Sequence, residues 1–580
     1  MSMKTTFTTQ KPKQTGSALM LTLIMSAIAL AILAAAMSWS ASSTRLTYRS
    51  IQYTRSVAAA EAATEKVVSQ INRDFLYGGE SLVINNLNSY RQNTAPSSSD
   101  SVYWSTWQFN DASGNIGQTY VQRGTSVSYI SINPPYTNLQ AFVSTYTVVS
   151  DAKDTASPQD LTVGVLQQLQ LAQIPIFQFA MYSSGNMEIS CGQPFDITGP
   201  VHSNGKLYVE PDSSMTFESA VTAVVTNVFQ RDPLDTRGPP AGEVVYVEPD
   251  QKKSPVAALT LPIGTTNTPE AIREIIEPPS SSSEDPNSPI GHLRYYNQCD
   301  MLVIASDTGV SATSGRFNNF GTHIPTNEVA LFVTITNHFW DAREGKTVLP
   351  IDINIGSLTA WSQTNSSLSS SLIGSNLTSV YVVDNRTLPA TSLGAVRVFN
   401  GLQLPVNGLT VATGRPLYVL GDYNQLNAAN LGHTNTSTTR PASLVADAIT
   451  ILSDHWTDAN STSAVGSRTA SSTTVNAAFL TGVVETTLGH YSGGMENFPR
   501  FLESWGPIIF TYNGSMIKMF PSLYATNVWG QANVYDPPAR NWAYDANFSD
   551  PTKVPPKTPS LLKVIRNQWA TVPPGQNVAP

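Results

Sequence analysis

The segment from Asp454 to Asp458 holds the side-chain types that commonly bind metals. It places two carboxylates and the imidazole of His455 within one short stretch, which could supply oxygen and nitrogen ligands. No third and fourth ligand follow at a known metal-site spacing. We therefore favour an ordinary surface loop for this segment.

Two further groups could take part in polar chemistry. His202, in a Val-His-Ser-Asn-Gly segment, fits either a polar site or a turn whose side chains bond their own backbone, and we favour the turn. Glu496, Arg500 and Glu503 could include a carboxylate pair for glycoside hydrolysis, but an ion network is the interpretation that we favour. The sequence has no nucleophile elbow, P-loop, dinucleotide fingerprint or His-Glu-x-x-His motif. We expect no catalytic residue, metal or cofactor.

The chain has two cysteines, Cys191 and Cys299. In an oxidising compartment they could form one disulfide that closes a long loop. Two buried free thiols are the alternative. Sequence spacing does not decide between them, because a disulfide requires that the two residues meet in space.

An uncharged apolar run near the N-terminus is the strongest signal in the chain. No charged residue occurs between Lys13 and Arg45. As a helix with about 1.5 Å rise per residue, residues 18–37 would span roughly 30 Å, the thickness of one bilayer core. The run could be a secretory signal peptide or an ordinary signal anchor. A third interpretation is a leader cut between Gly16 and Ser17, which leaves the run on the mature chain.

The residues that follow the run favour the third interpretation. Residues 45–73 contain no proline or glycine, and their apolar side chains recur with helical spacing. This pattern predicts one helix of about 55 residues, first apolar and then amphipathic, which ends near Phe75 at the segment Tyr77-Gly-Gly79. The predicted apolar face of its second half consists of Leu46, Ile51, Val57, Ala58, Ala62, Val68 and Ile71.

A glycine followed by Ser17-Ala-Leu-Met-Leu, a basic stretch and then Ala58-Ala-Ala-Glu-Ala-Ala63 resembles the N-terminus of PilX-type minor pilins. The resemblance covers about residues 11–75. It implies cleavage after Gly16 by a prepilin peptidase and packing of the mature helix against other pilins. The fifth mature residue is Leu21, where major pilins usually have Glu, and Ser17 stands where Phe or Met is usual. Atypical minor pilins and pseudopilins, some of them at filament tips, share the missing Glu.

Composition and charge agree with an exported protein. Only 13% of the 580 residues are charged, and the net charge of −8 argues against nucleic-acid binding, which requires Lys and Arg. Lys4, Lys11 and Lys13 precede the apolar run and predict a cytoplasmic N-terminus. With the family resemblance, this implies a single span of the bacterial inner membrane. The body would then be periplasmic, and extracellular if a filament assembles.

The rest of the chain predicts a mainly β fold. Short strands separated by Gly or Asn turns every eight to twelve residues or so are typical of a β-solenoid, and a β-sandwich would give a similar pattern. We therefore expect one long N-terminal α-helix, a pilin-like stalk, and a β-solenoid or β-sandwich body. The predicted domains are a leader (1–16), a transmembrane and amphipathic helix (17–75), a pilin-like α+β domain (76–175), the first part of a β-rich body (176–275), an insertion with Ser/Pro-rich loops (276–395), the second part of the body (396–550) and an extended tail (551–580).

Two hypotheses on function follow from these patterns. The first is a non-enzymatic pilin-like or pseudopilin-like subunit of a type IV pilus or a related secretion system. Its body is too bulky to repeat at every subunit, so it would be rare or tip-located and serve assembly or adhesion to a surface or glycan. Aromatic-rich segments between residues 476 and 545 also resemble, more weakly, large pilus-assembly-associated proteins. The second is a membrane-anchored polysaccharide-active enzyme on a β-solenoid, which the 10 Trp and 22 Tyr permit.

Overall fold

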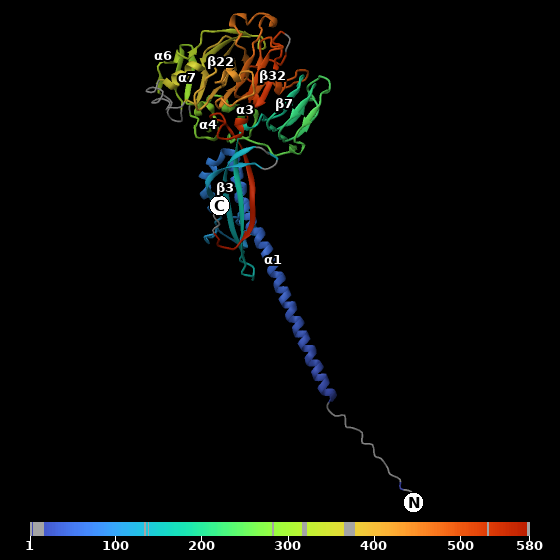
Figure 1. Ribbon diagram of the computed structural model, residues 1–580. Coiled ribbons are helices and arrows are strands. Elements are labelled where there is room, and N and C mark those ends of the chain that lie inside the picture. The colour runs from blue at the N-terminus through green and yellow to red at the C-terminus, as the bar shows by residue number, and fades with distance from the viewer. Residues whose placement is uncertain are drawn as a thin grey trace.

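A computed structural model of the chain shows a long N-terminal helix, a small sheet packed along part of it, and a large β-rich head beyond that sheet (Figure 1). The structure describes residues 3, 17–132, 135–136, 139–280, 283–315, 322–364, 377–530 and 533–576. The predicted fold class, mainly β with one long N-terminal α-helix, is confirmed.

Helix α1 (Ser17–Asn85) forms where the sequence is rich in alanine and has no proline or glycine before Gly78. The backbone leaves the helical region at Gly78 (φ −134°, ψ 16°) and Gly79 (φ 71°, ψ −170°). Residues with a Cβ rarely adopt the positive φ of Gly79, so this pair ends the regular helix and a short second helical segment follows. The helix end predicted at Tyr77-Gly-Gly79 is confirmed.

The buried face of α1 differs from the predicted one. Every side chain from Ser17 to Ile51 is exposed, and burial begins at Gln52. The predicted face is confirmed at Val68 and Ile71, which are buried, and is wrong at Leu46, Ile51 and Ala58, which are exposed. Small side chains occupy the first part of the contact, since they let the helix approach the sheet closely. The buried residues are Gln52, Ser56, Ala59, Ala60, Ala63, Thr64, Val67, Val68, Ile71, Asp74, Phe75 and Val83.

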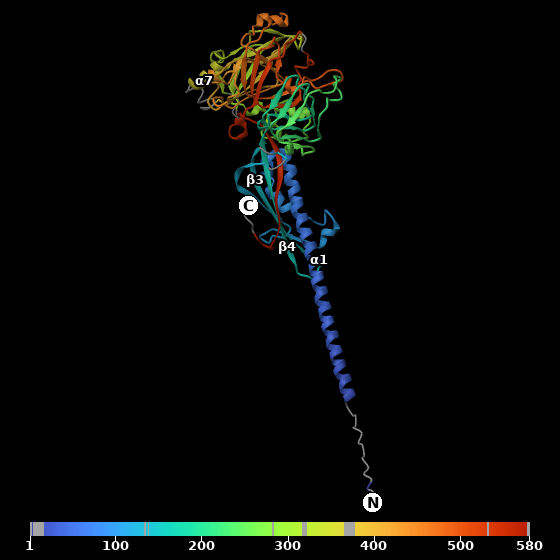
Figure 2. The same cartoon turned by 45° about the vertical axis from the view of Figure 1, so that its right-hand side comes forward.

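An antiparallel sheet packs along the second half of α1, with the short helix α2 (Leu87–Asn93) at its side (Figures 1 and 2). Its strands are β1 (Trp107–Asn110), β2 (Tyr120–Ser131), β3 (Gln140–Asp154), β4 (Thr162–Pro175) and β33 (Ser560–Val572). Strand β33 pairs with β4 along its length, so Ser560–Val572 of the predicted extended tail completes this stalk sheet. The helix and the sheet share a core in which Ile71 and Phe75 pack with Tyr146, Leu171 and, from β33, Leu562.

The head is built around two long sheets of mainly parallel strands. The first, here called the proximal sheet, contains in spatial order β14 (Lys252–Lys253), β11 (Val221–Ala223), β8 (Val201–Ser203), β5 (Met181–Ser183), β31 (Met516–Pro521), β28 (Ala478–Val483), β25 (Ala442–Ala446), β23 (Leu409–Thr413), β21 (Ser379–Asp384), β15 (Met301–Ser306), β16 (Gly309–Ser314) and β17 (His323–Ile324). Only the last two of these join antiparallel to their neighbours.

The second long sheet, here called the distal sheet, faces the proximal sheet across the head interior. It contains β18 (Val333–Thr334), β19 (Phe339–Asp341), β20 (Lys346–Asn354), β22 (Ser392–Gly401), β24 (Leu417–Tyr423), β26 (Ile449–Leu452), β27 (Thr473–Asn476), β29 (Arg500–Phe501), β30 (Ile509–Gly514) and β32 (Ala539–Tyr544). Apolar side chains of both sheets fill one continuous core, including Val303, Val382, Val398 and Phe479. Parallel sheets wound in this way identify the head as a β-solenoid and not as an antiparallel β-sandwich.

The first rungs of the solenoid are highly regular. Met181, Val201 and Val221 are in register and follow one another at intervals of 20 residues. Two smaller parallel sheets complete these rungs. They consist of β6 (Met187–Ile189), β9 (Lys206–Val209) and β12 (Thr226–Val228), and of β7 (Phe195–Ile197), β10 (Met215–Phe217) and β13 (Val244–Tyr246).

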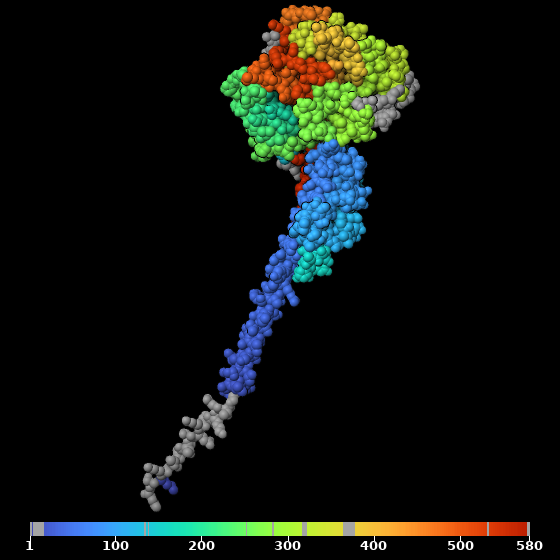
Figure 3. All heavy atoms as spheres, turned by 180° about the vertical axis from the view of Figure 1, so that it is seen from behind, coloured from blue at the N-terminus to red at the C-terminus, as the bar shows by residue number. Residues whose placement is uncertain are grey.

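The chain enters the solenoid near its middle and builds it in two directions. It runs outward from β5 to β14, then crosses to the far end at β15 and returns through β21 to β31, which pairs with β5. Figure 3 shows the two parts side by side, the first in green and the last in red-orange. The expectation that 276–395 is an insertion is wrong, because β15, β20 and β21 of that range are strands of the two long sheets.

The crossing segment covers the outer face of the proximal sheet and separates it from the stalk. It carries α3 (Pro269–Arg273), α4 (Pro289–Leu293) and α5 (Tyr295–Gln298), and its Ile275 and Tyr295 pack with Tyr381 of the sheet. Stalk residues such as Ile174 belong to the same cluster. The distal sheet therefore lies on the side of the head that is remote from α1, as Figure 1 shows for β22. Helices α6 (Thr326–Val329) and α7 (Ile355–Thr364) lie at the β15–β17 end.

Candidate functional site: the exposed apolar helix and the polar clusters of the head

The N-terminal half of α1 has no folded partner. Within the described residues, α1 is the one helix long and apolar enough to cross a membrane, and its most apolar stretch is entirely exposed. Leu21, Ile24 and Ile28 are between 48% and 65% exposed, and no residue that the structure describes covers them. Apolar surface on this scale is unfavourable in water, at about 25 cal/mol per Å², so it needs lipid or other helices around it.

The spacing along α1 separates the apolar stretch from the folded stalk. Trp39 is 75% exposed and follows the apolar run, in the position where tryptophan commonly lies at a bilayer interface. The first buried residue, Gln52, comes 13 positions later, or about 20 Å along a helix. With Trp39 at the interface, the stalk sheet would therefore stand clear of the lipid.

The predicted cleavage position lies at the edge of the described residues. Ser17 is the first residue of α1, and Gly16 lies outside the described residues. Leu21, one turn into the helix, is 65% exposed. Thr22, the neighbouring polar residue, donates its hydroxyl to the carbonyl oxygen of Ala18 at 3.0 Å, so this group is satisfied within the helix as a lipid environment requires.

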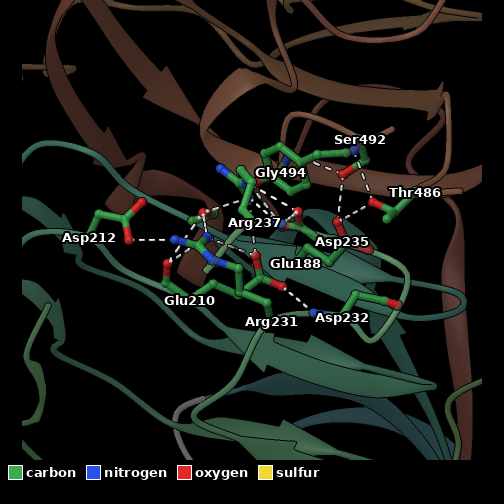
Figure 4. Close-up of polar contacts among 12 residues, drawn as sticks. Glu188, Glu210, Asp212, Arg231, Asp232, Asp235, Arg237, Thr486, Ser492 and Gly494 are labelled. Carbon is green, nitrogen blue, oxygen red and sulfur yellow. Dashed lines mark hydrogen bonds and ion pairs between the residues drawn. The ribbon is translucent and has the colours of Figure 1, made fainter. Parts of the chain in front are cut away.

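A charged cluster in the head was not found from the sequence (Figure 4). It forms where the loop after β12 folds back onto the first rungs. Arg231 and Arg237 each place a guanidinium nitrogen 3.6 Å from the buried carboxylate of Glu210. Arg231 also pairs with Asp212, and Arg237 with Asp235 at 2.7 Å.

A loop from the other half of the solenoid closes this cluster. The carboxylate of Glu188 accepts hydrogen bonds from the hydroxyls of Thr486 at 2.6 Å and Ser492 at 2.8 Å. Glu496 accepts the backbone N–H of Ser190 at 3.0 Å. The cluster therefore joins the two halves of the chain that meet between β5 and β31.

Burial changes the protonation of this cluster. It raises the pKa of Glu210 to about 8, with further contributions from the nearby carboxylates, against the lowering effect of the Asp232 N–H. Burial also raises the pKa of Glu188 and of Glu496. Carboxyls with raised pKa can act as acids or bases, but here they bond to protein groups. No group of three His, Cys, Asp or Glu side chains within the described ranges is arranged to hold a metal.

Replacing Glu210 by Gln is expected to reduce the pH dependence of head stability. The folded-state pKa of about 8 lies above the ordinary value of 4.5, so the wild-type carboxyl contributes stability that is complete below pH 4.5 and is lost as the pH rises through 8. Between pH 5 and pH 9, the free energy of unfolding of Glu210→Gln should rise by roughly 2–4 kcal/mol relative to that of wild type. Unfolding midpoints across this range measure the effect. The exposed Glu218→Gln is the control, and parallel profiles for wild type and Glu210→Gln would contradict the prediction.

His202 lies in β8, fully buried at the junction of head and stalk. Its Nδ1 is 2.8 Å from Thr222 Oγ1, its Nε2 is 2.9 Å from Asn204 Oδ1, and its ring stacks on Tyr182 at 5.6 Å. Burial lowers the pKa of His202 to about 4, so the imidazole is neutral at neutral pH. The chain bends at Asn204 and Gly205 as expected, and Ser203 donates its hydroxyl to the backbone carbonyl oxygen of Lys206 at 3.0 Å. The expectation is wrong for His202 itself, because its ring bonds other side chains.

The two other groups singled out in the sequence are dispersed. Asp454 and His455 are exposed, whereas the Asp458 carboxylate accepts hydrogen bonds from Arg397 at 2.6 Å and from Trp456 Nε1 at 3.0 Å. Glu496, Arg500 and Glu503 each bond a separate partner, respectively Ser190, Glu344 and Ser453. The candidate metal ligands Asp454, His455 and Asp458 are therefore not brought together as a site, and neither is a carboxylate pair.

The cysteines do not pair in this structure. Cys191 and Cys299 are both free and buried. Cys191 lies in the solenoid interior, whereas Cys299 lies in the layer between the proximal sheet and the stalk. Burial raises the pKa of each thiol to about 12. Of the two alternatives, the structure therefore shows two buried free thiols. The proximal sheet lies between the two apolar clusters that contain them.

No family model matches the sequence, and no curated protein matches it. One solved structure with some likeness is the competence-associated pilin ComZ from Thermus thermophilus, at 9% identity over 89% of this chain and 98% of that one. The TM-score of 0.27 does not establish a common fold.

Proposed function

We propose that this chain is a non-enzymatic, pilin-like subunit of a type IV pilus or a related secretion system. The observation that carries the proposal is the two-part helix α1. Its apolar half is fully exposed, and its other half carries a sheet and a large head without a flexible linker between them. A plain membrane anchor does not need such a continuous helix, whereas a subunit that leaves the membrane by helix packing does.

The proposed mechanism follows from the exposed surface of α1. A prepilin peptidase would cut between Gly16 and Ser17 on the cytoplasmic side of the inner membrane. The apolar half would then exchange lipid for the helices of other pilins as the subunit is extracted. Because helix and stalk sheet share one core, this movement would carry the head with it.

The head suggests a rare subunit at the filament tip. It is much wider than the stalk that carries it (Figure 3), so neighbouring copies in a closely packed shaft would collide. Leu21 agrees with this position, since a subunit with nothing above it has no need of the Glu that pairs with a neighbour's terminal amine. A tip subunit could serve assembly or adhesion.

The mature N-terminus tests this proposal. Mass spectrometry of the protein from cells with and without their prepilin peptidase is expected to give a methylated Ser17 start only when the peptidase is present. Gly16→Leu should abolish this cleavage, and Gln14→Leu should not. A start near Trp39, or an intact N-terminus in both strains, would reject the pilin-like function. The enzyme hypothesis would then be favoured, and shortening of a polysaccharide by the purified chain would support it.

A further inference from the structure

A groove of about 510 Å³ opens on the outer face of the distal sheet. This volume lies within the range of about 300–1,000 Å³ that small-molecule sites occupy. The groove, here called the distal groove, runs between the segment before and within β19 and the turn at residues 458–462. Its lining includes Thr336, Asn337, Trp340, Thr347, Asp458 and Thr462.

The floor of the distal groove is rigid. The ring of Phe339 packs edge-on against Tyr418 at 5.0 Å and Trp456 at 5.7 Å. Arg397 lies over the same ring at 5.3 Å and binds Asp352 at 2.6 Å. A floor that is locked by packing and ion pairs keeps the groove open without a ligand and lowers the cost of ordering it on binding.

The charges at the groove disfavour an anionic ligand. Asp458 is the one carboxylate among the described lining residues, and it accepts hydrogen bonds from two Arg397 nitrogens at 2.6 and 3.1 Å, while the same guanidinium also binds Asp352. His338 also lines the groove, but no Lys or Arg does within the part of the chain that the structure describes, so a phosphate or a carboxylate would find no permanent positive charge. No group of three His, Cys, Asp or Glu side chains among the described residues is arranged for a metal ion either. A neutral ligand therefore fits the groove best.

The remaining lining combines an indole with hydroxyl and amide groups. Trp340 is partly exposed, between the buried Phe339 and Asp341, and its backbone N–H donates to Ser461 Oγ at 2.9 Å. This bond fixes β19 against the turn that forms the opposite wall. An aromatic face stacks on the C–H face of a sugar ring, while threonine and asparagine side chains exchange hydrogen bonds with its hydroxyls.

We propose that the distal groove binds a neutral oligosaccharide of a few sugar units, with Trp340 as the stacking platform. The biological role of this binding rests on the proposed function, because a tip subunit would present the distal sheet outward, away from α1. The binding reaction itself requires only the folded head.

The test uses the full chain in a zwitterionic detergent without sugar groups. Maltotetraose, cellotetraose, mannotetraose and N-acetylated chitotetraose serve as probes in isothermal titration calorimetry. At least one is expected to bind with a dissociation constant in the micromolar to millimolar range. Trp340→Ala should weaken that binding at least tenfold, and Trp340→Phe should weaken it less. The matched control is Trp569→Ala, because Trp569 is 49% exposed on β33 of the stalk, remote from the groove.

A second variant guards against a folding defect. Thr462 is exposed at the groove rim, so Thr462→Lys should leave the unfolding midpoint unchanged while it obstructs the groove and reduces binding to a similar extent. Binding of none of the four probes, or equal binding by wild type, Trp340→Ala and Thr462→Lys, would overturn the assignment. Processing at Ser17 without sugar binding rejects this inference alone, whereas sugar binding by an unprocessed chain rejects only the pilin-like function.

Discussion

Arginine at both Ile28 and Ile32 is expected to prevent insertion of α1 into a membrane. The two side chains are 48% and 64% exposed near the centre of the apolar run, so only lipid surrounds them in the membrane-inserted chain. Each arginine at a helix centre opposes insertion by about 2.5–3.5 kcal/mol, and the favourable contribution of each isoleucine is lost as well. The pair should therefore cost roughly 6–8 kcal/mol, or at least four orders of magnitude in the insertion equilibrium.

Fractionation and carbonate extraction measure this loss. Wild type should remain in the extracted membrane pellet, whereas Ile28→Arg/Ile32→Arg should appear in the soluble fraction or be degraded. Ile51→Arg is the matched control, because Ile51 is 51% exposed on the same helix but lies beyond the apolar run. The head should unfold at the same temperature in all three proteins, since none of these side chains contacts it. A double variant that stays in the pellet would show that α1 is not the anchor.

The sequence predicts α1 well because its determinants are local. The absence of proline and glycine before Gly78, and the pair Gly78 and Gly79, define both the helix and its end. The buried face was predicted only in part, because it depends on a sheet that distant residues form. Burial on α1 begins only at Gln52, so Leu46 and Ile51 remain exposed, whereas Ala60 packs against the sheet.

The architecture of the head could be predicted only in part. Short strands between regular turns indicated stacked rungs, but the same spacing also fits a sandwich, because strand direction is not encoded in turn spacing. The pairing of β5 with β31 joins residues more than 300 positions apart, and no local sequence pattern predicts it. For the same reason the sequence suggested an insertion where the chain crosses to β15.

The sequence contains a signal from which part of the charged cluster could have been predicted. The first rungs repeat every 20 residues, but Met215 of β10 pairs with Val244 of β13, 29 positions later. The additional residues carry Arg231, Asp232 and Asp235, charges of both signs in an otherwise poorly charged chain. An extended rung with mixed charges indicates a loop that folds onto the solenoid. The partners of that loop could not be predicted, since Tyr491, whose ring centre lies 3.7 Å from the Arg237 guanidinium, and Gly489, whose N–H donates to the Leu234 carbonyl oxygen, come from the other half.

Asp447 should be the most costly single polar substitution in the head. Its carboxylate is fully buried in the turn between β25 and β26, and its Oδ1 accepts hydrogen bonds from Arg273 Nη1 at 2.7 Å and the N–H of Leu523 at 2.6 Å. Its Oδ2 accepts the N–H groups of Tyr524 at 3.0 Å and Ala525 at 2.9 Å. One side chain thus ties the crossing segment and the loop after β31 to the solenoid.

Asp447→Ala should lower the free energy of unfolding of the head by about 3–5 kcal/mol, because it removes the acceptor of three backbone N–H groups and one of the two carboxylates that pair with the largely buried Arg273. Asp447→Asn should cost less, since it retains one carbonyl oxygen as an acceptor. The exposed Asp454→Ala, in the loop after β26, should change stability by less than about 0.5 kcal/mol. Urea unfolding followed by tryptophan fluorescence measures all three. A cost below about 1 kcal/mol for Asp447→Ala would mean that apolar contacts alone hold the loop after β31, and that the Asp447 carboxylate contributes little to fixing the crossing segment on the solenoid.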